Sequence, residues 1–373
     1  MEAGTGYSAR LGTNTTLTFA GTGLYTGDKT FTLTRNDGDE KSGYNLIGNP
    51  YPSFLDYHAA TVSASVLPTS IWTRSCTVGG VMAFDTYNSS LNTGVSGSGN
   101  PVTQYIAPMQ AFWVKVATGT TGSLTVTNDM RSLKDETTST NRLKAPAIAT
   151  QQLLRLQVSN GTNSDEAVIA FNENASDDFD NYDSPKMSND NVVIPEIYTL
   201  VRSEKIAING LKSITTNQKL PLGFTTGESN TYSIKATEIK NFDVDTKIIL
   251  KDNLLNTEQD ITDGTPYSFT SNIASNTLRF NIIFKSASVT TVIDSEKLSV
   301  NIFKNTNGQI TINRNLSIDQ EGTVTICNAL GQKLVNIPTT GASTVINKSF
   351  NSGVYFVTIK VAGRNTTKKV IIN

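Results

Sequence analysis

Apolar and polar residues alternate along most of this chain, and glycine or asparagine closes the alternating runs. Leu17, Phe19, Phe31 and Leu33 alternate with threonine around a glycine-rich turn, which is the pattern of a β-hairpin. Helical periodicity is almost absent from the sequence. The pattern therefore predicts an all-β chain that is built of tandem β-sandwich modules.

Two polar stretches divide the predicted strands into groups. Residues 136–150 lie in a polar stretch that is rich in Thr and Ser, and residues 289–295 lie in another run of small and polar residues. Both are typical of connectors. We expect a β-sandwich surface module at 1–135, whose N-terminal part lies upstream, and a second β-sandwich module at 151–288. Residues 296–373 then form a small immunoglobulin-like sandwich of about seven strands.

The last of these modules shows the clearest alternation in the chain. Leu298, Val300 and Ile302 alternate with polar residues, and Asn307-Gly308 follows them as a turn signal. Because the alternation and the turn residues agree, residues 296–373 are expected to fold as an independent unit.

Three segments near the C-terminal end match a known pattern in their order, spacing and position. They are Gly322–Gln332 (GTVTICNALGQ), Asn351–Ile359 (NSGVYFVTI) and Lys368–Asn373 (KKVIIN). Together they resemble the type A C-terminal sorting domain of substrates of the Bacteroidetes type IX secretion system. Cys327 departs from that pattern, because an aromatic residue is more usual there. The upstream segments resemble β-modules that precede such domains in adhesin-like and enzyme-bearing surface proteins.

The resemblance implies an address and not a catalyst. It implies export through an outer-membrane translocon barrel, transfer by a companion shuttle barrel, and removal of the domain by a sortase-like protease that anchors the cargo at the cell surface. The family pattern carries over as sorting-signal recognition or fold-defining residues at Gly331, Gly353, Tyr355, Lys368 and Lys369. Read locally, the glycines supply turn dihedrals and the lysines protect an edge strand.

An acidic segment offers the one candidate metal site. Asp177, Asp178, Asp180 and Asp183 could provide hard oxygen ligands for calcium, the cation that suits extracellular modules. The EF-hand pattern fails, because Tyr182 stands where an acidic or amide residue is needed and Asp183 where a glycine is needed. A solvated acidic loop is the structural alternative. No other cofactor is predicted.

Candidate chemistry elsewhere is sparse. His58 is the single histidine of the chain and lies in no catalytic motif, so we predict no Ser-His-Asp or Cys-His site and no zinc site. Cys76 and Cys327 are far apart in the sequence, which argues against a disulfide framework. Trp72 is expected to be more exposed than Trp113 and is therefore the candidate for stacking on a surface glycan.

The charge balance excludes one class of partner. The net charge is −1 and the pI about 6.0, so no basic field attracts nucleic acid. The first residues lack the basic and apolar regions of an export leader, which we expect upstream of this chain. We therefore interpret the chain as the non-catalytic C-terminal region of an exported cell-surface protein, adhesin-like or gliding-associated. The alternatives are the accessory and sorting modules of a secreted hydrolase whose catalytic domain lies upstream, or a glycan-binding module.

Overall fold

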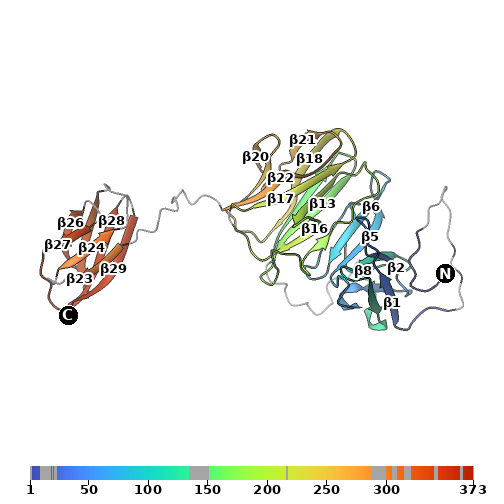
Figure 1. Ribbon diagram of the computed structural model, residues 1–373, viewed down its shortest axis with the longest axis horizontal. Coiled ribbons are helices and arrows are strands. Elements are labelled where there is room, and N and C mark those ends of the chain that lie inside the picture. The colour runs from blue at the N-terminus through green and yellow to red at the C-terminus, as the bar shows by residue number, and fades with distance from the viewer. Residues whose placement is uncertain are drawn as a thin grey trace. The chain divides into compact units, whose positions relative to one another are not determined.

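The structure is a computed structural model. It describes residues 2–8, 18, 20, 23–133, 151–215, 217–286, 300–304, 309–314, 321–339, 343–361 and 364–372, so the expected connectors at 136–150 and 289–295 lie outside the described residues. The described elements are β-strands and two 3-10 helices, η1 (Tyr57–Ala59) and η2 (Asn128–Met130), which confirms the all-β prediction. In these residues no helix is long and apolar enough to cross a membrane. The chain divides into two compact units, Met1–Ala287 and Ser288–Asn373 (Figure 1).

The N-terminal part of the first unit holds three small sheets around one core. A five-stranded sheet has the order β2 (Tyr44–Gly48), β9 (Ala111–Lys115), β5 (Ser70–Cys76), β6 (Met82–Asn88) and β7 (Thr93–Val95). The two three-stranded sheets are β1 (Lys29–Thr34), β10 (Thr121–Val126) and β4 (Thr61–Val62), and β11 (Arg131–Ser132), β3 (Phe54–Asp56) and β8 (Tyr105–Ile106). Alternate residues such as Leu33, Ile47, Phe112 and Leu124 point inward and are buried together.

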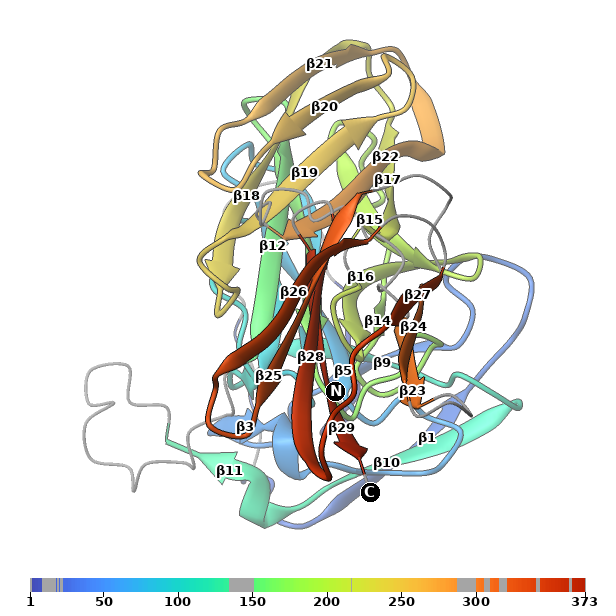
Figure 2. The same cartoon turned by 90° about the vertical axis from the view of Figure 1, so that its left-hand side faces the viewer.

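The rest of the first unit is one eleven-stranded sheet. Its order is β20 (Thr257–Asp260), β19 (Thr246–Asp252), β22 (Ala274–Ser286), β17 (Lys219–Thr226), β15 (Glu196–Val201), β16 (Glu204–Leu211), β13 (Ser164–Phe171), β12 (Gln152–Ser159), β18 (Asn230–Lys240) and β21 (Tyr267–Ser271), with β14 (Ser184–Pro185) paired to β16. Its two ends lie side by side (Figure 2), and the Thr257 and Tyr267 hydroxyls are 3.1 Å apart. The sheet therefore curls into a sandwich-like shape around a core that includes Leu154, Phe224 and Phe280.

Direct contacts join the two parts of the first unit. The Ser70 hydroxyl of β5 lies 2.7 Å from the Ser184 hydroxyl of β14. The Arg74 guanidinium pairs with Asp190 at 3.0 Å, and the Asn189 side chain accepts the backbone N–H of Phe84 at 2.8 Å. The strands before residue 134 and after residue 150 thus belong to one compact unit.

The second unit consists of two facing sheets. One contains β23 (Val300–Lys304), β24 (Ile310–Arg314) and β27 (Ser343–Ile346), and the other has the order β26 (Lys333–Thr339), β25 (Gly322–Asn328), β28 (Gly353–Val361) and β29 (Arg364–Ile372). Ile310 and Ile312 of the first sheet and Val324, Val357 and Ile359 of the second are buried in the same core. Period-2 alternation therefore places one face of each sheet inside.

Candidate functional site

Trp72 lies at the junction inside the first unit and is completely buried. Its indole N–H donates to the carbonyl oxygen of Pro185 at 3.0 Å, and its ring packs edge to face on Tyr44 with the centroids 4.8 Å apart. The expectation of an exposed, glycan-stacking Trp72 is therefore wrong. Pro185 of the eleven-stranded sheet covers the face of β5 on which Trp72 lies. Trp113, which pairs with Trp72 in the neighbouring strand, is only half-buried.

The four acidic residues Asp177, Asp178, Asp180 and Asp183 do not form a metal site. In the part of the chain that the structure describes, no group of three or more His, Cys, Asp or Glu side chains could hold a metal ion. Asp178 instead pairs with Arg202 at 3.1 Å on the exposed surface. This arrangement contradicts the predicted calcium site.

Asp180 and Asp183 stabilise the backbone of their own loop. Asp180 accepts the N–H groups of Ser176 and Tyr182, each at 2.7 Å. Buried Asp183 accepts the N–H of Asp180 at 2.9 Å and of Gly210 at 3.0 Å. Burial raises the pKa of Asp183 to about 7, although both N–H donors act to lower it. The hydrogen bonds that Asp180 and Asp183 accept in the turn therefore account for these two carboxylates.

His58 belongs to a small polar cluster. Its Nε2 atom lies 2.8 Å from the Tyr87 hydroxyl, which donates to Asn92 Oδ1 at 2.6 Å. Asp56 accepts the backbone N–H of His58 at 3.1 Å. Burial raises the pKa of Tyr87, so the phenol stays protonated and acts as a structural hydrogen-bonding group.

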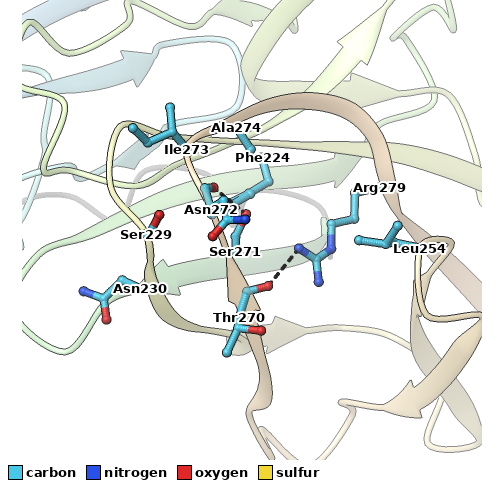
Figure 3. Close-up of a pocket in the computed structure, with 10 residues that line it drawn as sticks. All are labelled: Phe224, Ser229, Asn230, Leu254, Thr270, Ser271, Asn272, Ile273, Ala274 and Arg279. Carbon is cyan, nitrogen blue, oxygen red and sulfur yellow. Dashed lines mark hydrogen bonds between the residues drawn. The ribbon is translucent and has the colours of Figure 1, made fainter.

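A hollow of about 540 Å³ opens at one end of the curled sheet (Figure 3). Three connections surround it, and they contribute Ser229 between β17 and β18, Leu254 between β19 and β20, and Ile273 between β21 and β22. A second hollow of about 300 Å³ shares Ile273 and adds Val192 from the segment between β14 and β15. Four connections therefore meet at this end, as they do in sandwich proteins that bind through their loops.

Arg279 lies against the wall of the larger hollow in a fixed position. It is almost fully buried, and its Nε and Nη2 groups donate to Asp252 Oδ2 at 3.2 and 3.0 Å. Its Nη1 group donates to the carbonyl oxygen of Thr270 at 3.2 Å (Figure 3). The guanidinium also lies 4.5 Å from the ring centroid of Phe269 and 4.9 Å from that of Phe280. A guanidinium has five N–H donors, and these bonds use three of them.

The rim of the hollow is aliphatic and exposed. Leu254 and Ile273 are 67% and 72% exposed, and Val192 and Leu255 are exposed beside them. The lining between them carries amide and hydroxyl groups, from residues such as Asn230 and Ser271. Exposed aliphatic side chains at loop tips around hydrogen-bonding groups are typical of a binding surface. In the sequence, the only signal for this site is the adjacent Leu254 and Leu255 in a polar turn.

The predicted sorting-signal glycines have different local roles. Gly331 has a φ of +81° in the turn between β25 and β26, and its N–H donates to the carbonyl oxygen of Asn328 at 3.0 Å. This left-handed backbone favours glycine. Gly353 begins β28, and an added Cβ would meet only ordinary contacts, the nearest 3.7 Å away on the Tyr355 ring. The backbone therefore requires glycine at 331 but not at 353.

Tyr355 and the two lysines occupy distinct positions in the four-stranded sheet. Tyr355 is buried, and its hydroxyl donates to the carbonyl oxygen of Asn351 at 2.8 Å. Lys368 and Lys369 are both exposed on β29, which pairs with β28 and with no other described strand. Lys368 lies opposite the core residue Val357 and Lys369 opposite Phe356, so the two lysines are on opposite faces of the sheet.

The fold defines an all-β protein with a two-layered C-terminal unit. Comparison with known families shows that residues 286–373 match the secretion system C-terminal sorting domain. Residues 1–284 match a domain of unknown function, DUF8693, and the chain belongs to this family. No curated protein and no solved structure matches the chain. The sorting domain confirms the prediction that this is a substrate of the type IX secretion system, exported across the outer membrane to the cell surface or the medium.

Proposed function

We propose that the first unit is a non-catalytic, adhesin-like binding module and that its partner binds in the hollow between the loops of the curled sheet. The observation that carries this proposal is the combination of a fixed, charge-neutralised wall and an exposed aliphatic rim. The Arg279 guanidinium is the charged part of the wall, and Leu254 and Ile273 belong to the rim.

The wall is suited to binding because its charge is already balanced. Acid-base and nucleophilic catalysis use a group that can exchange a proton or attack the substrate. Arg279 cannot lose its proton in a protein, and Asp252 is completely buried while it accepts hydrogen bonds from Arg279. The two guanidinium N–H groups that have no acceptor among the described residues suit neutral oxygen acceptors, such as carbonyl or hydroxyl groups.

Rigidity of the wall also favours binding. Phe269, Phe280, Thr270 and Asp252 hold the guanidinium in one position, so a partner does not have to order this side chain. The rim provides the second contribution. Full burial of one Leu or Ile side chain is worth about 1.5–3 kcal/mol, and Leu254 and Ile273 retain most of this surface for a partner.

Exchange of one rim residue tests the proposal. Ile273→Asp should lower attachment of cells that display the chain by about tenfold, because a charge replaces apolar surface at the contact. Attachment is measured on bare glass, on polysaccharide-coated glass and on gelatin-coated glass, after normalisation to the amount of surface antigen.

Val244→Asp is the matched control. Val244 is 97% exposed and lies between β18 and β19, in the connection at the opposite end of these strands from the hollow. It should leave attachment unchanged. If cells that display the wild-type chain attach no better than cells without it on all three surfaces, the adhesin proposal is wrong. If both variants attach like the wild type, the hollow is not the binding site.

A further inference from the structure

The four-stranded sheet of the sorting domain carries charge of one sign only. Its strands contain Lys333, Lys360, Arg364, Lys368 and Lys369, and they contain no Asp or Glu. The chain as a whole is balanced, with 31 Lys and Arg against 32 Asp and Glu. The basic character of this sheet is therefore a local feature and not a consequence of overall composition.

The strand register gathers three of the lysines on the outer face. Lys333, Cys327, Phe356 and Lys369 lie in one row across β26, β25, β28 and β29. Lys360 is four positions after Phe356 on β28 and hence on the same face. Among the described residues, no carboxylate lies within ion-pair distance of these lysines.

Exposed apolar side chains lie among these lysines. Phe356 is 40% exposed and Ile371 is 60% exposed. Ile371 pairs with half-buried Val354, two positions from Phe356 on the same face. The opposite face of the sheet packs on the core with Val357 and its neighbours. An aromatic and an aliphatic side chain among lysines that have no ion pair within the described residues form a surface suited to a partner with an apolar contact and an acidic border.

We propose that this outer face is the surface through which the sorting domain docks on the export apparatus, and that the docking partner is a protein surface with an acidic border around an apolar contact. The proposal rests on the sorting role of the domain and is independent of what the first unit binds. A protein partner is favoured by the sorting match, which implies contact with the secretion machinery, and anionic lipid is an outcome of the test below.

Lys368 has a different role from Lys369. It is an inward-facing lysine on an edge strand, a device that discourages pairing with another strand. Lys368 and Lys369 are adjacent, equally charged and both exposed, and they differ in the face that they occupy. They form a matched pair that separates docking by the outer face from any general effect of positive charge.

The test compares Lys369→Glu and Lys368→Glu in the tagged full chain, produced in type IX-competent cells. The ratio of surface and released protein to periplasmic protein should fall about tenfold for Lys369→Glu, because a like charge then meets an acidic partner. It should fall less than about twofold for Lys368→Glu, because glutamate also places a charge on the inward face of the edge strand and so still discourages pairing with another strand. Thermal unfolding of the purified chains shows whether each variant folds.

Phe356→Thr is the second variant, because threonine already occupies positions 325, 358 and 367 on this face. It should also cause periplasmic accumulation. Normal export of folded Lys369→Glu and Phe356→Thr chains would overturn the proposal, and so would an equal loss for both lysine variants. Co-sedimentation of the wild-type chain with vesicles of outer-membrane lipid, abolished by Lys369→Glu, would assign the face to lipid and overturn the protein partner.

Discussion

Replacement of Trp72 by alanine is expected to destabilise the first unit by about 3–5 kcal/mol, the usual cost of deleting a large buried aromatic side chain. Trp72 is completely buried, and it joins β5 to Pro185 in the following part of the unit. The substitution therefore removes packing from the junction and leaves the Pro185 carbonyl oxygen without its donor. Urea unfolding followed by far-UV circular dichroism measures the change.

Trp113→Ala is the control for this prediction. Trp113 lies opposite Trp72 in the neighbouring strand but is only half-buried, so its loss should cost clearly less. Because the junction is continuous, the wild-type unit should unfold in one transition, and Trp72→Ala should shift the whole transition. Equal midpoints for wild type and Trp72→Ala would contradict the importance of this junction.

The second large effect is expected at the buried ion pair of Lys186 and Asp165. Their side chains are only 4% and 1% exposed, and the Lys186 ammonium contacts the Asp165 carboxylate directly. Lys186→Met should cost about 3–5 kcal/mol, because it leaves a buried carboxylate without its cation. In this variant the Asp165 carboxylate keeps the hydrogen bond from the backbone N–H of Ile197 at 2.9 Å.

The double variant Lys186→Met/Asp165→Leu separates loss of the pair from loss of packing. Replacement of both partners by apolar residues of similar size is often close to neutral. The double variant should therefore recover part of the stability that the single variant loses, as measured by urea unfolding. The recovery is incomplete because the Ile197 N–H then lacks its acceptor. If the double variant is no more stable than Lys186→Met, the uncompensated carboxylate is not the cause of the loss.

The strands could be predicted from the sequence because alternation is a local property. Val324 and Ile359 each lie between two polar residues, and both are buried in the core of the second unit. The sorting domain could be predicted for a similar reason. Its segments lie close together at one end of the chain, where their order and spacing can be compared directly with a family pattern.

The junction and the hollow could not be predicted in the same way. Trp72 is buried by Pro185, which is more than a hundred positions away in the sequence. The hollow combines Leu254, Ile273 and Val192 from connections that are separate in the sequence and meet only because the sheet curls. Such sites depend on long-range strand order, which alternation does not encode.

The acidic segment shows a different limit. The spacing of its carboxylates is compatible with cation binding. In the structure, however, the oxygens of Asp180 and Asp183 accept hydrogen bonds from backbone N–H groups. The N–H of Gly210 on β16 donates to Asp183, and no local sequence pattern predicts this long-range hydrogen bond. Asx-type turns and metal loops share the same residue types, so composition alone did not separate them.

Export through the C-terminal domain is the central claim, and a transfer experiment tests it most directly. Residues 286–373, the part that matches the sorting domain, are fused to a fluorescent reporter carrying a periplasmic leader in type IX-competent cells. The same reporter fused to residues 286–363, which lack β29, is the control. We predict that the complete fusion reaches the cell surface or the medium while the shortened one stays in the periplasm. Retention of the folded, complete fusion in the periplasm would contradict it.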